Sequence, residues 1–259
     1  MSGYEVASGV LTIVVLTSCS GTISPFRRQA VVGRDTYAIF VADGPGGAAD
    51  LFGVRGDGGE VFPITFTPVA EARPALSPDG LMVAFLRGDG RADTVPGTPW
   101  VMNLLTGAER RLELPVDARA EAIGWSRDGR TLYVRAGRFA YSFPAPPASD
   151  LPRAVLPDES YRMDSALGVF VGEPPFARVF RCEQTICAVS DSGPSRPIAD
   201  EARDPARWGA DSVGYFAGDE LLVRPVGPGR ARRVEWSRPP PRARELTAFA
   251  GGPTRSPPP

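Results

Sequence analysis

The chain has 259 residues, of which 42% are hydrophobic and 23% are charged. This length and composition are those of one folded domain with a full core, and they exclude a largely disordered chain. The sequence contains no histidine and no lysine, which excludes Ser-His-Asp and Cys-His catalysis, metal sites built on imidazole, Schiff-base chemistry and a P-loop.

The amino-terminal segment, residues 1–19, contains a short apolar run, ASGVLTIVVL, that leads into Leu-Thr-Ser-Cys. The run is well below the roughly 20 residues that span a bilayer, and it has the length of the apolar part of a signal peptide. The sequence Leu-Thr-Ser-Cys resembles the lipobox of bacterial lipoproteins, which implies that Cys19 becomes the lipidated first residue. The preceding region has no Arg or Lys and carries Glu5, unlike an ordinary export signal. The alternative is an uncleaved apolar stub that packs on a partner or a membrane surface.

Between residues 28 and 238 the sequence predicts repeated groups of short strands separated by Gly, Asp and Pro turns. Each group contains three or four runs of β-branched or aromatic residues, and we find no amphipathic helix period of any length. In chain order, the groups begin at Thr36, Arg73, Ala122, Ala166 and Pro205. We therefore expect an all-β protein in which each group forms one antiparallel sheet.

The clearest repeat is a four-residue turn that follows the first strand of a group. Its residues are Ser77, Pro78, Asp79 and Gly80 in one group, and Ser126, Arg127, Asp128 and Gly129 in the next. Pro78 fixes φ, Asp79 can bond back to the backbone, and Gly80 accepts a positive φ, so we expect a tight turn with a structural role. The apolar residues beside these turns are expected to pack between neighbouring sheets: Leu76, Trp125 and Trp208.

This pattern resembles the Pro-Asp-Gly repeat of TolB-type, WD40-like β-propellers, whose units carry a Trp-Ser-Pro-Asp-Gly turn and a later Thr-Gly. The match is close from Ser77 to Gly80 and at Thr106-Gly107, good from Trp125 to Gly129, and faint at Trp208. The resemblance covers most of residues 36–236. The resemblance implies a β-propeller of about five four-stranded blades, whereas the family has six. It implies this architecture but no particular activity.

Closure of the ring needs a further strand, because the first group lacks an innermost one. Residues 239–259 form a tail rich in Pro and Arg, in which the run Arg244–Phe249 (RELTAF) lies behind three prolines. We expect this run to cross back and pair with the first group, which would remove exposed strand edges. Residues 29–34 (QAVVGR) are the competing segment.

The net charge of −1 hides an asymmetry along the chain. Residues 225–259 hold seven arginines and two glutamates, a local charge of +5 that leaves −6 on the remainder. A basic tail on an acidic body can dock on anionic lipid or on an acidic partner, while a tail kept soluble by arginine is the alternative. The candidate docking residues are Arg230, Arg232, Arg233, Arg242 and Arg244.

Cys182 and Cys187 flank Glu-Gln-Thr-Ile between two β-rich runs. They can face each other across a hairpin at disulfide distance, and with Cys19 lipidated the remaining cysteine count is even, as a secreted protein prefers. Free thiols are the alternative. A metal site is a poor alternative, because no histidine completes a tetrahedron around two sulfurs, and we expect neither metal nor cofactor.

These observations predict a non-catalytic, membrane-tethered β-propeller on the periplasmic side of the bacterial cell envelope, anchored as a lipoprotein. It would bind protein partners as a scaffold or as an extrinsic subunit of a membrane complex. One alternative is a periplasmic sensor or carrier that binds a small ligand in the channel of the ring. The other is a divergent enzyme that uses Asp79, Asp128 and Asp211, although these recur with the turn and should be spread round the ring. No nucleic-acid partner is expected, since the basic cluster has no interleaved aromatic residues.

Overall fold

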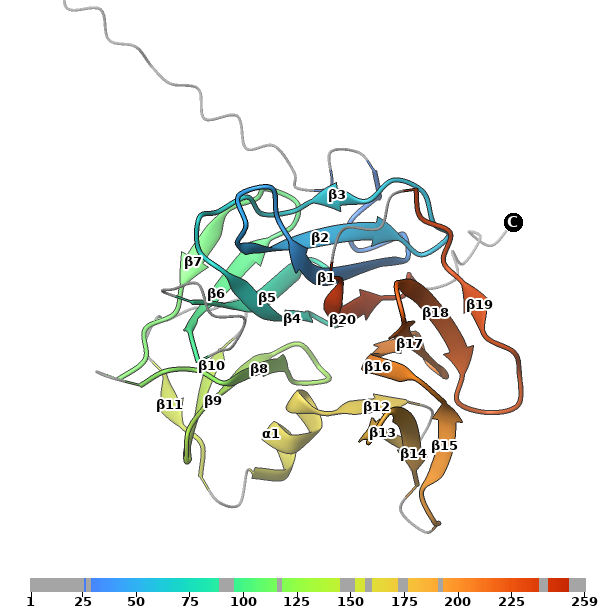
Figure 1. Ribbon diagram of the computed structural model, residues 1–259. Helices are drawn as coiled ribbons and strands as arrows, with labels where there is room; N and C mark the ends of the chain where they lie inside the picture. Colours follow the sequence, from blue (N-terminus) through green and yellow to red (C-terminus); the bar gives the residue numbers. More distant parts are fainter. Residues whose placement is uncertain are drawn as a thin grey trace, which may run out of the picture.

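Five four-stranded antiparallel sheets stand around a common centre in this protein, like the blades of a propeller (Figure 1). The computed structural model describes residues 26, 29–88, 96–115, 118–144, 152–156, 160–171, 177–190, 193–237 and 242–251. Twenty strands and one short helix lie within these residues. The predicted all-β propeller is confirmed, and its number of blades is five.

In each blade the strands follow one another outward from the centre, and only blade 1 takes its inner strand from the other end of the chain. Blade 1 contains β20 (Arg244–Phe249), β1 (Tyr37–Asp43), β2 (Ala49–Arg55) and β3 (Phe62–Pro63). Blade 2 contains β4 (Glu71–Leu76), β5 (Met82–Arg87), β6 (Thr98–Asn103) and β7 (Glu109–Arg111). Blade 3 contains β8 (Ala122–Trp125), β9 (Thr131–Ala136), β10 (Phe139–Pro144) and β11 (Arg153–Ala154). Blade 4 contains β12 (Val169–Val171), β13 (Ala177–Cys182), β14 (Thr185–Val189) and β15 (Arg196–Ala199), and blade 5 contains β16 (Ala202–Trp208), β17 (Ser212–Ala217), β18 (Glu220–Pro225) and β19 (Arg232–Arg233).

The ring is closed by β20, the last strand within the described residues. β20 pairs antiparallel with β1, from Tyr37 opposite Phe249 to Val41 opposite Arg244. The competing segment, residues 29–34, contains no strand. One blade therefore holds the first and the last strand of the described residues, and the inner edge of β1 is covered.

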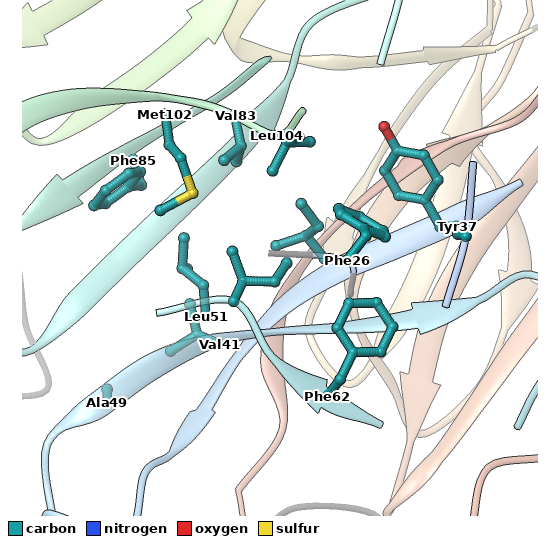
Figure 2. Close-up of a cluster of buried hydrophobic side chains, with 13 residues drawn as sticks. Phe26, Tyr37, Val41, Ala49, Leu51, Phe62, Val83, Phe85, Met102 and Leu104 are labelled. Carbon is teal, nitrogen blue, oxygen red and sulfur yellow. The ribbon is translucent and has the colours of Figure 1, made fainter. Parts of the chain in front are cut away.

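Buried apolar side chains hold neighbouring blades together. Within the described residues, four core clusters lie at the contacts of blades 1 and 2, 2 and 3, 4 and 5, and 5 and 1. Figure 2 shows the first of these clusters, in which Phe26, Tyr37 and Leu51 lie on the side of blade 1 and Val83 and Phe85 of β5 belong to blade 2.

The apolar residues beside the repeated turns lie at these contacts, as the sequence predicted. Trp125 is 7% exposed in the cluster between blades 2 and 3, and Trp208 is 5% exposed in the cluster between blades 5 and 1. Leu76 packs against the cluster between blades 1 and 2. Trp125 also donates a hydrogen bond from Nε1 to the carbonyl oxygen of Ala75 in blade 2, at 2.9 Å.

The contact between blades 3 and 4 is built differently, because the helix α1 (Ser160–Leu167) lies between β8 and β12 (Figure 1). Gly124 of β8 permits this approach, since a Cβ atom there would collide with the carbonyl oxygen of Ala166. No amphipathic helix period marks this segment of the sequence, and α1 is the one short helix within the described residues of an all-β fold. It has 8 residues, none of them buried, and a helix of about two turns is too short for a 3.6-residue period to stand out in the sequence.

Candidate functional site

The repeated turn of blade 2 is closed by its own side chains. Ser77 Oγ donates to Asp79 Oδ1 at 2.6 Å, and the backbone N–H of Leu81 donates to the same carboxylate oxygen at 3.0 Å. Ser77 Oγ in turn accepts from the N–H of Met82 at 2.9 Å. Serine and aspartate therefore satisfy each other and the turn backbone, as expected of a structural Asx-type turn.

Blade 3 repeats this arrangement with Ser126 and Asp128 at the same three distances of 2.6, 3.0 and 2.9 Å. The backbone donors are here Arg130 and Thr131. The hydrogen bond from Ser126, followed by that from the N–H of Arg130, lowers the pKa of Asp128. The turn therefore stabilises the ionised form of this aspartate. A carboxylate with a lowered pKa is poorly suited to act as a base near neutral pH.

The glycines of the two repeated turns allow a matched test of how closely each turn packs against its neighbours. Gly80 and Gly129 both have a φ of 69°, so alanine at either position costs roughly 1 kcal/mol of backbone strain. A Cβ atom at Gly80 would also lie 2.7 Å from Phe249 Cγ and 2.8 Å from Tyr37 Oη, whereas one at Gly129 would lie 3.5 Å from Pro78 Cδ. We expect Gly129→Ala to lower the melting temperature by about 2–4 °C and Gly80→Ala by at least about twice as much. Equal losses in thermal melts followed by circular dichroism would contradict the close packing at Gly80.

The three turn aspartates do not converge on one site. Asp79, Asp128 and Asp211 belong to blades 2, 3 and 5, and none of them lines the central cavity. Asp211 accepts a hydrogen bond from Ser212 Oγ at 2.9 Å. Their recurrence therefore follows the turn, as the sequence predicted.

A cavity of about 1110 Å³ occupies the centre of the ring, between the inner strands of all five blades and α1. This volume is slightly larger than the roughly 300–1,000 Å³ of ordinary ligand pockets. Its lining is mostly polar and includes five arginines and four carboxylates, so the channel is a surface for charged groups. Ser77, Pro78 and Ser126 of the repeated turns belong to its lining.

Three adjacent inner strands carry a β-bulge at the equivalent position. The bulges lie in β16, β20 and β4, where two residues lie opposite one on the paired strand. Each bulge places a charged residue in the left-handed region: Asp204 at a φ of 54°, Glu245 at 52° and Arg73 at 55°. Such a conformation costs roughly 1–3 kcal/mol for a residue other than glycine and is found at functional sites more than elsewhere. All three residues line the cavity.

Two of the cavity carboxylates are held by neighbouring arginines. Glu245 accepts from the backbone N–H of Arg73 at 2.6 Å, and the Arg73 guanidinium lies 3.8 Å from its other oxygen. Asp204 lies 2.9 Å from the guanidinium of Arg203. This arrangement is not predicted above from the sequence, although prolines inside two predicted strands, Pro74 and Pro205, are a signal for bulges.

Two arginines line the cavity at the end of the ring where the inner strands finish and the repeated turns begin. Arg127 belongs to the β8–β9 turn and Arg207 to the end of β16, and both line the cavity. The Arg127 guanidinium lies 5.4 Å from the ring centre of Phe170, and its Nε donates to Ser165 Oγ at 3.3 Å. Burial and the like charge of Arg207 lower the pKa of Arg127.

The arginines predicted for docking lie in blade 5 and in the segment that closes the ring. In blade 5, Arg232 donates to the carbonyl oxygen of Gly56 in blade 1 at 3.1 Å, and Arg233 lies 2.7 Å from Glu220. Arg230 is exposed. The first of these contacts links two blades, so Arg232 contributes to the ring itself.

The other two docking candidates fasten β20 to β1. Arg242 and Arg244 lie 3.6 and 3.5 Å from the carboxylate of Asp43, the last residue of β1. Each pair is partly exposed and contributes about 0–1 kcal/mol. This end of the chain is therefore part of the ring as far as Gly251, and the interpretation of a separate basic tail does not apply to residues 242–251.

The cysteines of blade 4 form a disulfide across the β13–β14 hairpin. Cys182 and Cys187 have Cα atoms 6.0 Å apart. Cys19 lies outside the described residues. Among the described residues, no cluster of three or more Cys, Asp or Glu side chains could hold a metal ion, and no helix is long and apolar enough to cross a membrane.

Comparison with known proteins relates the fold to TolB. No protein-family model and no curated protein sequence matches the chain. The crystal structure of TolB from Acinetobacter baumannii is similar with a TM-score of 0.60 and 13% identity, over 83% of this chain and 66% of that one. A putative TolB from Agrobacterium tumefaciens has a TM-score of 0.35 and 14% identity over 77% and 69% of the two chains. A chain of a nidogen/laminin complex has a TM-score of 0.40 and 11% identity over 78% and 82%.

The first of these similarities defines the class of protein. Its TM-score shows that the chain has a β-propeller fold similar to that of TolB, and at 13% identity the similarity shows the fold alone. This chain spans just under two thirds of that TolB structure, at 66% of its length. The other two structures have TM-scores of 0.35 and 0.40 and add no further argument.

Proposed function

We propose that this protein is a non-catalytic, protein-binding β-propeller of the bacterial cell envelope, held on the periplasmic side of a membrane as a lipoprotein. The observation that carries the proposal is the closed ring with its polar central cavity of about 1110 Å³. A ring of sheets joined by buried clusters is rigid, and its loops and channel rim form a preorganised surface for a partner.

Two further features support the location. The sequence Leu-Thr-Ser-Cys at residues 16–19 resembles a lipobox, so lipid chains on Cys19 would supply the membrane affinity, at about 0.8 kcal/mol for each buried methylene. The Cys182–Cys187 disulfide suits an oxidising compartment. The partner is accordingly sought in a membrane complex, of which this protein would be an extrinsic subunit.

A second candidate function is favoured by the volume of the cavity. A channel of about 1110 Å³ can enclose a small molecule, and charged groups from several blades converge on it. In this alternative the protein is a periplasmic sensor or carrier, and the ring serves as the wall of a ligand pocket.

Membrane fractionation and affinity purification test the proposal together. We expect the protein in the membrane fraction of its native host, labelled by palmitate, and we expect a membrane complex to copurify with it in stoichiometric amount. Cys19→Ala should lose the label and the membrane association, while Ser18→Ala, which keeps the cysteine, should retain both. Recovery of the unchanged protein as a soluble monomer without a partner would contradict the scaffold and favour the ligand carrier.

A further inference from the structure

A loop at the contact between blades 1 and 2 presents apolar side chains to solvent. This Phe66 loop comprises residues 64–70 and joins β3 to β4. Phe66 is 71% exposed, more than any other large hydrophobic residue in the described part of the chain. Pro63 at the end of β3 and Pro68 within the loop are exposed as well. A single exposed apolar residue is ordinary on a protein surface, so the surroundings of Phe66 decide whether it has a role.

The segment around Phe66 differs from the other connections between blades in its lack of charge. Residues 61–70, VFPITFTPVA, contain no acidic and no basic residue, although 23% of the whole chain is charged. Each of the other four connections between successive blades contains at least two charged residues. The centres of protein interfaces are depleted of charged residues and enriched in aromatic ones. The composition of this loop is therefore typical of a contact surface.

Hydrogen bonds on both sides of Phe66 fix the loop. The hydroxyl of Thr65 donates to the carboxylate of Glu71, and the backbone N–H of Thr67 donates to Asp50 Oδ1 at 3.0 Å. Thr65, Glu71 and Asp50 are each at most 5% exposed. Buried groups thus hold the two neighbours of an exposed ring. The loop backbone is already ordered, so little conformational freedom is lost when the ring binds a partner.

The Phe66 loop and the beginning of the described chain lie at opposite ends of β1. Asp50, which holds the loop, pairs with Ala42 near the end of β1. Phe26 packs instead against Tyr37, the first residue of β1, with ring centres 4.5 Å apart. The chain between Cys19 and Phe26 reaches at most about 25 Å. A lipid on Cys19 would therefore hold the Tyr37 end of blade 1 near the membrane and leave the Phe66 loop on the far side.

We propose that the Phe66 loop docks another protein, which receives the ring of Phe66 in an apolar pocket. A ring that protrudes from a fixed loop matches a concave apolar surface, and aromatic side chains in such pockets carry much of the binding energy of interfaces. The inference rests on the scaffold function proposed above, and it names the surface by which the scaffold holds its partner.

Two other occupants fit the Phe66 loop less well. A second copy of this chain would need an interface of about 800 Å² on each partner, whereas a large aromatic side chain buries about 150–250 Å². A lipid surface favours basic residues beside apolar ones, and residues 61–70 contain none. The loop also lies away from the end of blade 1 that leads to the proposed lipid anchor. A protein on the far side from the membrane is therefore the occupant that the charge and the position of the loop favour.

Photocrosslinking in intact cells of the native host tests the surface. A benzophenone amino acid replaces Phe66 in the full-length chain, and in a matched variant it replaces Leu105. Leu105 is 51% exposed and lies in the β6–β7 turn, next to the β4–β5 turn at the opposite end of blade 2. We expect one crosslinked protein at position 66, with the new bond mapped by mass spectrometry to an apolar residue of that protein. Position 105 should give at least tenfold less of this product.

Four results of the crosslinking would overturn the proposal. They are the absence of a product at position 66, a product made of two copies of this chain, a product with lipid alone, and equal amounts of one product at both positions. The lipid product would assign the loop to the membrane surface, and the product of two copies would assign it to self-association.

Phe66→Ala measures the contribution of the ring. Since the side chain is 71% exposed, the variant should keep the melting temperature of the unchanged protein. It should recover at least tenfold less of the crosslinked partner in an affinity purification, whereas Leu105→Ala should recover the full amount. Full recovery with Phe66→Ala would leave the scaffold function standing and refute this docking surface. A protein crosslinked at position 66 of a chain that is not membrane-bound would support the surface and refute the membrane tether.

Discussion

Deletion of residues 240–259 is expected to abolish the folded ring. The deletion removes β20, which is the innermost strand of blade 1 and contacts β1, β4 and β16. Leu246 is 8% exposed, so its burial is worth about 1.5–3 kcal/mol, and the half-buried Phe249, whose ring lies 5.4 Å from that of Tyr37, adds part of such an amount. Together with the lost strand pairing, this approaches the whole stability of a domain, about 5–15 kcal/mol. We expect the near-ultraviolet circular dichroism and the cooperative thermal transition to disappear.

Hydrogen bonds from neighbouring blades add to this loss. Leu76 donates its backbone N–H to Thr247 Oγ1 at 3.2 Å, and Arg203 Nη1 donates to the carbonyl oxygen of Ala243 at 2.6 Å. Deletion of residues 252–259 alone leaves β20 intact and is the matched control. If the protein that lacks residues 240–259 melted at the same temperature as the full-length protein, the ring would not need this strand for closure.

The blades could be predicted from the sequence at positions where a particular residue type favours one backbone conformation. Proline, aspartate and glycine in the turn at Ser77–Gly80 each fulfil a separate requirement of a tight turn, so the strands on both sides are also located. The tryptophans beside the turns could be assigned to blade contacts because large apolar residues at a repeating position need a repeating place of burial. The run Arg244–Phe249 was notable because it is apolar and isolated, and the first group needed a strand.

The channel could not be predicted in the same way, because its residues come together only when the ring closes. Arg127 and Arg207 lie in different blades, and nothing local in the sequence marks either as facing the centre. The bulges at Arg73, Asp204 and Glu245 depend on the strands paired beside them. The basic carboxy-terminal segment was interpreted from its charge alone, whereas the contacts of Arg242 and Arg244 with Asp43 require β20 to lie beside β1.

Glu71 and Arg87 form a buried ion pair that the amino-acid sequence alone does not reveal. The Glu71 side chain is fully buried, and its Oε1 lies 2.5 and 3.0 Å from Nη2 and Nε of Arg87. Its other oxygen accepts from the hydroxyl of Thr65. The Arg87 guanidinium lies over the ring of Trp100 at 4.5 Å and also reaches Glu109 at 2.9 Å. Burial raises the pKa of Glu71, while the hydrogen bonds from Thr65 and Arg87 act in the opposite direction.

Arg87→Met is expected to destabilise the protein strongly at neutral pH. The variant leaves the Glu71 carboxylate buried without its cation, and removal of one partner of a buried pair costs about 3–5 kcal/mol. For a chain of this size that corresponds to a fall of roughly 10 °C in the melting temperature. The double variant Arg87→Met, Glu71→Leu should regain most of the loss, because it leaves no unpaired buried charge. Equal melting temperatures for the single and double variants would contradict a coupled pair.

The same single variant should acquire a characteristic pH dependence. A carboxyl group whose pKa is higher in the folded protein than in the unfolded chain stabilises the fold at low pH and loses that contribution as the pH rises. The ordinary pKa of glutamate is 4.5, burial already raises that of Glu71, and loss of Arg87 raises it further. The gap between wild type and Arg87→Met should therefore be small at about pH 5 and widen towards pH 8, while the double variant shows no such widening. Melts at both pH values check this, and a gap independent of pH would assign the loss to side-chain packing around Trp100 instead of to the charge of Glu71.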